Sequence, residues 1–175
     1  MNFQSNTVLI TGASRGLGAN FSKVLAHDGF KIIGVGRNLQ NLKSVISSLP
    51  NQDLGHSYLE LDITDELQVQ RMLNDLNIYA LINNAGISGA RGRIDKVDID
   101  KAKKVFDVNF FGVWQGCAVF SKKMIEQGTE PAIYNVGSEN SLFIAVPNSV
   151  AYVASKHAVF GLSESLRNDP VSYTH

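Results

Sequence analysis

The segment Thr11-Gly12-Ala13-Ser14-Arg15-Gly16-Leu17-Gly18 decides the fold of this chain. It follows a short β-rich run, TVLIT at residues 7–11, and it precedes an amphipathic helical pattern. Glycines at these positions let the chain turn tightly, so that backbone N–H groups and the positive end of the helix can approach a pyrophosphate. Glycine-rich turns between a strand and a helix also occur without nucleotides. The position after the first strand, at the start of a βαβ unit, favours a dinucleotide site.

The pattern outside this segment alternates between strands and helices. Apolar runs predict strands at residues 7–11, 31–35, 58–61, 79–83 and 131–136. Periodic apolar positions predict helices between them, including a third helix capped by Thr64, a long one over about 100–127 and a last one over about 151–167. Such alternation predicts the α/β class: a Rossmann-like, doubly wound parallel sheet in three αβα layers. We expect a single domain over residues 1–169.

Composition excludes several other classes of protein. Lys and Arg number 16, as do Asp and Glu, so the bulk charge gives no sign of nucleic acid or an anionic membrane as a partner. Cys117 is the single cysteine, which excludes an intrachain disulfide, and the four histidines lack metal-ligand spacing, so we expect no metal. The N-terminus has no basic region and its apolar run is short, so we predict no signal peptide, no membrane span and a cytoplasmic location.

The residues after the second predicted strand indicate which dinucleotide binds. An NAD site usually places Asp or Glu about 20 residues beyond the loop to hold the ribose hydroxyls. This sequence has no acidic residue between Asp28 and Asp53 and offers Gly36-Arg37-Asn38 instead, with Arg15 in the loop. Guanidinium groups bind phosphate through forked hydrogen bonds, so the two arginines predict NADP(H). The alternative is that both are solvated surface charges.

Six motifs occur together in a fixed order: TGASRGLG, Leu61-Asp62-Ile63, Asn83-Asn84-Ala85-Gly86, Asn109 within VNFFG, Ser138, and Tyr152-x-x-x-Lys156. In their order and approximate spacing they resemble the short-chain dehydrogenase/reductase family. The resemblance extends from residue 7 to about residue 168. The spacing of the loop glycines resembles the compact single-domain branch of that family.

The resemblance implies a catalytic set of Asn109, Ser138, Tyr152 and Lys156. Because a phenol titrates near ~10, a tyrosine that exchanges protons at neutral pH needs a nearby positive charge. An ammonium about 4 Å from it is worth on the order of 4 kcal/mol at an effective dielectric of 20, and Lys156 lies one helical turn away. The resemblance implies that Tyr152 is the proton donor or acceptor and that Lys156 also holds the nicotinamide ribose.

Two members of this set have alternatives. Ser138 precedes Tyr152 by 14 positions, one more than is common in the family, so Ser141 is a rival for binding the substrate oxygen. Asn109 is implied to bend its helix and to hold a water that links Lys156 to solvent, or else it is an ordinary hydrogen-bonded core residue. Glu139 and Asn140 lie nearby without an assigned role.

The remaining implied site residues contact the cofactor. Asp62 and Ile63 are expected to flank the adenine, and Asn84 to Gly86 are expected to line the ribose side of the cleft. The complete cofactor set is Gly12, Ser14, Arg15, Gly16, Leu17, Gly18, Arg37, Asp62, Ile63, Asn84, Ala85, Gly86, Tyr152 and Lys156.

These features predict an oxidoreductase that moves a hydride between NADP(H) and a small carbonyl or alcohol substrate. The family resemblance implies a homodimer or homotetramer for the full-length parent. The alternative function is a regulator that binds NADP(H) on the same fold without turnover.

The C-terminal residues shape one further expectation. Family members continue past the last helix, so we expect a chain that lacks its last strands, is incomplete at its C-terminus and is inactive alone. Residues 170–175, PVSYTH, continue no helical pattern and can be encoded by CCT GTC TCT TAT ACA CAT, which matches the end sequence of a transposase adaptor. We therefore expect a non-native tail there.

Overall fold

The computed structural model describes residues 6–74, 76–127, 132–142 and 146–167, and the predicted tail at 170–175 lies outside them. Within these residues the chain forms one five-stranded sheet in the order β3-β2-β1-β4-β5, and every adjacent pair is parallel. The strands are β1 (Thr7–Thr11), β2 (Lys31–Gly36), β3 (Ser57–Glu60), β4 (Ala80–Asn83) and β5 (Ala132–Asn135). The predicted α/β class and parallel sheet are therefore confirmed, and each strand lies within one residue of its predicted bounds, apart from the predicted start of the fifth at Pro131, which is outside the described residues.

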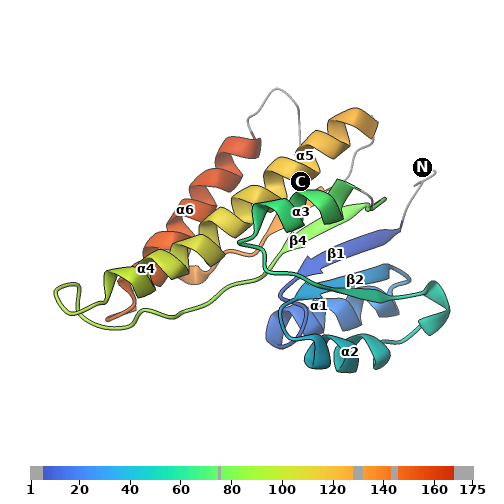
Figure 1. The fold of residues 1–175 in the computed structure, drawn as a ribbon, viewed down its shortest axis with the longest axis horizontal. Coiled ribbons are helices and arrows are strands. Elements are labelled where there is room, and N and C mark those ends of the chain that lie inside the picture. Colours follow the sequence, from blue (N-terminus) through green and yellow to red (C-terminus); the bar gives the residue numbers. More distant parts are fainter. Residues whose placement is uncertain (1–5, 75, 128–131, 143–145, 168–175) are drawn as a thin grey trace.

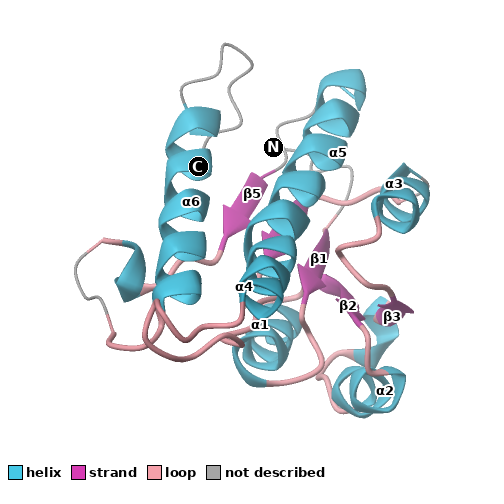
Figure 2. Cartoon of the chain, turned by 60° about the vertical axis from the view of Figure 1, so that its left-hand side comes forward, coloured by secondary structure: helices cyan, strands magenta, loops and turns pink. Residues whose placement is uncertain are grey.

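Helices cover both faces of the sheet (Figures 1 and 2). The helices are α1 (Gly16–His27), α2 (Leu39–Ser47), α3 (Glu66–Asn74), α4 (Ile99–Phe106), α5 (Gly112–Gln127) and α6 (Val150–Arg167). Alternate strand residues face opposite layers, since Val8 and Ile10 join the core with α1 and α2, whereas Leu9 and Leu81 pack with α3 and α5. The predicted three-layer arrangement follows from this alternation.

The long helix predicted over 100–127 contains an internal irregularity. Residues Asp107–Phe111 form a π turn between α4 and α5, with Asn109 at its centre. Beyond it, Gly112 and Gly116 bring α5 close to the sheet, since a Cβ at Gly112 would lie 2.6 Å from Ile63 and one at Gly116 would lie 2.6 Å from the Asn83 side chain. The helix is thus seated over the centre of the sheet, where the candidate site lies.

The third helix is capped differently from the prediction. The Asp65 carboxylate accepts the Gln68 N–H at 3.0 Å, whereas the hydroxyl of Thr64, the predicted cap, donates to Asp62 at 2.8 Å. The prediction of Thr64 was therefore wrong, because the preceding Asp62 offers the hydroxyl a charged acceptor that is already in place.

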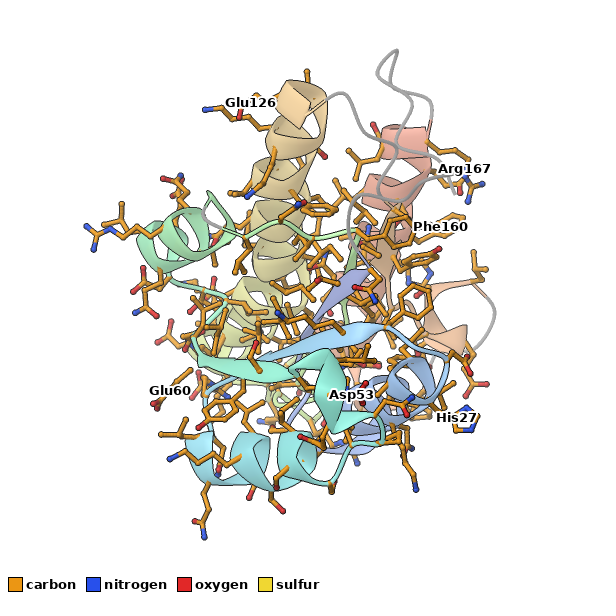
Figure 3. All side chains as sticks on the ribbon, turned by 90° about the vertical axis from the view of Figure 1, so that its right-hand side faces the viewer. His27, Asp53, Glu60, Glu126, Phe160 and Arg167 are labelled. Atoms are coloured by element: carbon orange, nitrogen blue, oxygen red, sulfur yellow. The ribbon has the colours of Figure 1, made fainter. Side chains whose placement is uncertain are left out.

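The two sides of β5 differ in their cover. Ile133 packs against the core beneath α5 and α6, whereas Tyr134 on the opposite face is 48% exposed. β5 is the last strand of the sheet among the described residues. Charged and polar side chains such as His27, Glu60 and Glu126 project outward at the periphery (Figure 3). None of the helices in the described ranges is long and apolar enough to cross a membrane.

Candidate active site

The glycine-rich loop leaves β1 and enters α1 with backbone geometry that its glycines permit. Gly12 and Gly16 have φ angles of +69° and +56°, a region that side chains with a Cβ rarely adopt. A Cβ at Gly12 would lie 2.8 Å from the Ala85 Cα, whereas Gly16 has open space around it. Arg15 is the N-cap of α1, and its side chain makes no capping hydrogen bond. The first turn of α1 thus presents N–H groups toward the loop, which suits an anion.

Asn84 joins this loop to the end of β4. Its side-chain amide donates to the Thr11 carbonyl oxygen at 2.9 Å, and its backbone N–H donates to the Thr11 hydroxyl at 3.0 Å. The Ala85 N–H donates to the same hydroxyl at 3.1 Å. The carboxyl ends of β1 and β4, where ligands of open α/β sheets bind, are therefore held together.

A cleft of about 800 Å³ opens at these strand ends. It is lined by almost all of the predicted cofactor residues of the N-terminal half: Gly12, Ser14, Arg15, Gly16, Leu17, Arg37, Asp62, Ile63, Asn84, Ala85 and Gly86. We refer to it as the dinucleotide cleft. Its volume, its glycine cradle and the free helix N-terminus fit a dinucleotide.

Gly18 is the predicted loop residue that does not line this cleft. A Cβ at Gly18 would collide with the carbonyl oxygen of Gly12 and lie 2.6 Å from the amide nitrogen of Asn84. Its place in the structure is a close contact between α1 and the loop, so it acts on the cleft through packing.

The charges at the far end of the dinucleotide cleft come from Arg37 and Asp62. Arg37 Nη1 lies 3.7 Å from Asp62 Oδ2, and the Arg37 side chain is 59% exposed. Burial raises the pKa of the Asp62 carboxyl, but hydrogen bonds from Thr64 and the charges of Arg37 and Lys104 outweigh it and hold the pKa below its usual value. The Arg37 side chain thus lines the cleft beside Asp62 and is still accessible to a phosphate.

A second cleft of about 420 Å³, which we call the catalytic cleft, adjoins the first. Both clefts are lined by Leu17, Asn84, Gly86 and Ile87, so the two are continuous. The other residues of the catalytic cleft are Ser88, Arg91, Val136, Gly137, Asn140, Val146, Ser149, Tyr152 and Lys156.

Tyr152 and Lys156 lie one turn apart on α6 and line the same cleft, as the spacing predicted. Lys156 is only 4% exposed, and its ammonium donates to the Val136 carbonyl oxygen at 2.7 Å. Burial lowers the pKa of Lys156 from its ordinary value. Its tether to the end of β5 aims the positive charge into the cleft that Tyr152 lines.

Asn109 is buried and its side-chain amide is occupied by other parts of the chain. It accepts the Ile87 N–H at 2.8 Å and donates to the Ile87 carbonyl at 2.9 Å and to the Ser155 hydroxyl at 3.1 Å. The π turn therefore supports the cleft wall at Ile87 and the helix that carries Lys156. The geometry fits the expected irregularity in the helix, and it also satisfies the alternative of a hydrogen-bonded core residue.

The structure separates the two rival serines. Ser138 is half-buried and caps the short 3₁₀ turn Glu139–Ser141, whereas Ser141 is 4% exposed and accepts the Ser138 N–H at 3.1 Å. Gly137 and Asn140, which flank Ser138 in the sequence, line the catalytic cleft, whereas neither serine is among its lining residues. Ser138 thus lies between two lining residues of the cleft, and its choice over Ser141 stays a prediction.

Sequence reasoning missed several residues of the catalytic cleft. Arg91 and Ser149 line it. No local signal marked them, because loops far apart in sequence place them: the Gly92 N–H donates to the Asn148 carbonyl at 2.9 Å. Within the described ranges, no three His, Cys, Asp or Glu side chains gather as a metal site would require.

In sequence, the chain is similar to known dehydrogenases and reductases. A 3beta-hydroxysteroid dehydrogenase of Mediterraneibacter gnavus is 28% identical over 95% of this chain and 61% of its own length. An NADPH-dependent 1-acyldihydroxyacetone phosphate reductase of Schizosaccharomyces pombe is 34% identical over 91% of this chain and 53% of its own length. The chain therefore spans between half and two thirds of the length of these curated relatives.

Solved structures agree with the sequence relatives. A short chain dehydrogenase/reductase from Burkholderia phymatum in complex with NAD has a TM-score of 0.87 at 30% identity, over 97% of this chain and 61% of that one. The family model described as short chain dehydrogenase matches residues 6–173. The predicted family is thus confirmed: this chain belongs to the short-chain dehydrogenases, and its sheet and helices are the Rossmann-like fold of that family.

Proposed function

We propose that the whole protein carrying this chain moves a hydride between NADP(H) and a carbonyl or alcohol carbon, with Tyr152 as the proton donor or acceptor. The observation that carries the proposal is the continuity of the two clefts. Tyr152 and Lys156 line a cavity that shares four lining residues with the dinucleotide cleft. A dinucleotide in one cleft can therefore reach a small substrate in the other.

The residues of this chain then have separate roles. A bound nicotinamide supplies the hydride chemistry, and the protein supplies position and charge. In reduction, Tyr152 gives its hydroxyl proton to the substrate oxygen, and in oxidation it takes the proton back. The buried ammonium of Lys156 favours the ionised phenol, and the Ser138 hydroxyl donates to the same substrate oxygen.

Cofactor preference rests on the charged side chains of the dinucleotide cleft. Arg15 and Arg37 line it, and the carboxylate that an NAD site would place after β2 is absent from the sequence. Among the relatives, the fission yeast reductase is NADPH-dependent and the Burkholderia structure holds NAD. The family therefore uses both cofactors, and the proposal of NADP(H) depends on these two arginines.

A single hydroxyl tests the proposed activity. In the whole protein, Tyr152→Phe should lower kcat by a factor of about 10² or more and leave NADPH affinity unchanged, because only the proton-transferring group is lost. Tyr134→Phe is the matched control, since that tyrosine is exposed on β5 outside both clefts. A wild-type protein that binds NADPH and reduces none of a broad carbonyl panel would favour the non-catalytic regulator instead.

A titration tests the cofactor preference in the 175-residue chain itself. NADPH should bind at least about tenfold more tightly than NADH, a difference of about 1.4 kcal/mol. Arg37→Asp should reverse the order, because it removes the phosphate ligand and adds an acceptor for ribose hydroxyls. Arg93→Asp, at an exposed arginine that pairs with Asp95 at 3.0 Å, is the control. Equal wild-type affinities for the two cofactors would refute the preference.

A further inference from the structure

Asn140 contacts the candidate catalytic serine with two donors. Its backbone N–H and its side-chain amide both donate to the Ser138 hydroxyl oxygen, each at 3.2 Å. Asn140 is 9% exposed and lines the catalytic cleft. The turn that holds the pair is closed from the other side, where the Ser141 hydroxyl accepts the Ser138 N–H. The Ser138 oxygen is therefore held in one place by its neighbours in sequence.

Among the described residues, the hydrogen bonds of the Ser138 hydroxyl use its lone pairs and leave its proton free. A serine hydroxyl has two acceptor lone pairs and one proton. Both lone pairs are directed at Asn140, and in the described part of the chain the proton has no acceptor. The hydroxyl is thus prepared to donate and not to accept. A carbonyl oxygen in the cleft requires a donor of this kind as negative charge develops on it.

The other side of the Asn140 amide is also unusual. Its Oδ1 is buried and has no hydrogen-bond partner among the described residues. An unpaired buried acceptor costs about 1–3 kcal/mol, so packing alone does not explain an asparagine here.

We propose that Asn140 is a positioning residue that makes Ser138 an obligate hydrogen-bond donor to the substrate oxygen. The inference rests on the proposed function, because it assigns Ser138 to that oxygen. Asn140 itself does not touch the reacting atoms in this proposal. It acts by filling the lone pairs of Ser138, so that the one remaining hydrogen bond of the hydroxyl points to the substrate.

Kinetics in the whole protein separates this role from a merely structural one. Asn140→Ala removes one of the two donors, and kcat should fall about tenfold with KM changed less than about twofold. Asn140→Asp has nearly the same shape but places an acceptor beside Ser138, which would capture the hydroxyl proton. Its kcat should therefore fall further, by about 10², close to that of Ser138→Ala. If packing alone mattered, the Asp variant would be the milder one, and that order would overturn the proposal.

The control for added charge is Asn148→Asp. Asn148 is exposed in the loop beside the same cleft and has a φ of +61°, which Asp also tolerates. Its kcat should stay within about twofold of wild type, since the substitution changes only an exposed side chain and keeps the backbone carbonyl that accepts the Gly92 N–H. A loss as large as that of Asn140→Asp would attribute the effect to charge alone and would contradict the positioning role.

A second measurement needs no turnover and uses the 175-residue chain. The side-chain amide protons of Asn140, assigned by the loss of their signal in Asn140→Asp, should exchange with water several-fold faster in Ser138→Ala, because their acceptor is gone. Exchange that does not respond to Ser138→Ala would refute the hydrogen bond. If exchange responds and the wild-type enzyme reduces no carbonyl, the proposed function fails while the contact survives. If turnover is normal and Asn140→Asp is harmless, the positioning role alone fails.

Discussion

The dinucleotide cleft and the catalytic cleft are adjacent but are built by different means. The glycine-rich loop that lines the dinucleotide cleft depends on backbone shape over a few residues, as at Gly12 and Gly16 with their positive φ angles, although Asn84 also ties it to β4. The catalytic cleft depends on side chains that bond across the chain. Asn109 reaches Ser155, 46 residues away, and Lys156 reaches Val136, 20 residues away.

This difference predicts how the two clefts respond to mutation. A local loop tolerates a change wherever the backbone and the space around it allow one. A cleft assembled from distant segments loses several contacts at once when a shared side chain is removed, because buried partners are left unpaired. Four substitutions test this contrast, from the largest expected effect to the smallest.

Asn109→Ala should have the largest effect. It leaves the N–H and the carbonyl of Ile87 without partners and also removes the bond to Ser155. We expect a loss of about 4 kcal/mol in the free energy of unfolding, measured by urea denaturation of the 175-residue chain. Asn20→Ala, at an exposed position of α1, should change it by less than about 0.5 kcal/mol. Equal losses in both variants would show that the catalytic cleft does not depend on this contact.

Alanine substitutions at two glycines separate the cost of backbone strain from the cost of a steric clash in the loop of the dinucleotide cleft. Gly16→Ala meets only the strain of a positive φ, about 1 kcal/mol, because no atom lies within 4 Å of the added Cβ. Gly12→Ala adds a clash with Ala85 to that strain, for a total of about 3 kcal/mol. Urea denaturation measures both. A Gly12→Ala variant as stable as Gly16→Ala would mean that the loop moves away from β4 without cost.

Asp62→Asn should have the smallest effect, and its effect should depend on pH. The pKa of Asp62 is lowered in the folded chain, so its contribution to stability is present above the unfolded pKa of about 3.9 and is lost as pH falls through the folded value. The pair with Arg37 is exposed, so at pH 7 the variant should lose less than about 1 kcal/mol. Thermal unfolding at pH 7 and pH 2.5 tests this, since the two proteins should converge in acid. If wild type and Asp62→Asn differed equally in unfolding temperature at both pH values, the ionised Asp62 carboxylate would not be the source of the difference.

Local patterns were sufficient for most of the fold. The apolar run at residues 7–11 became β1 without a shift, and the last helix starts one residue before its predicted start. Such runs carry their own signal, since burial on both faces requires continuous apolar residues and a helix requires a 3.6-residue period. The prediction of Thr64 as a cap was wrong because its hydroxyl donates to Asp62, which lies before the helix and outside the helical pattern.

Local patterns were less informative for the catalytic cleft. Tyr152 and Lys156 were predicted from the family resemblance, and their spacing of four places them on one face of a helix. Arg91 and Ser149 were not found, because their nearness arises where two loops meet, and such loops carry no periodic pattern. Asn140 was noticed without a role, since its two hydrogen bonds to Ser138 become visible only in the geometry of the turn.

The sequence by itself determined the α/β class, the strand bounds, the family and the residues of the glycine-rich loop. These follow from patterns within a few residues, where chain connectivity already keeps the interacting groups close. Only the tertiary structure decided that Asn84 joins the ends of β1 and β4, that Asn109 supports Ile87 and that Asn140 donates twice to the Ser138 hydroxyl. These contacts connect segments whose separation along the chain says nothing about their separation in space, or they depend on the direction of a single side chain within a turn. Both are settled by packing of the whole sheet and its helices.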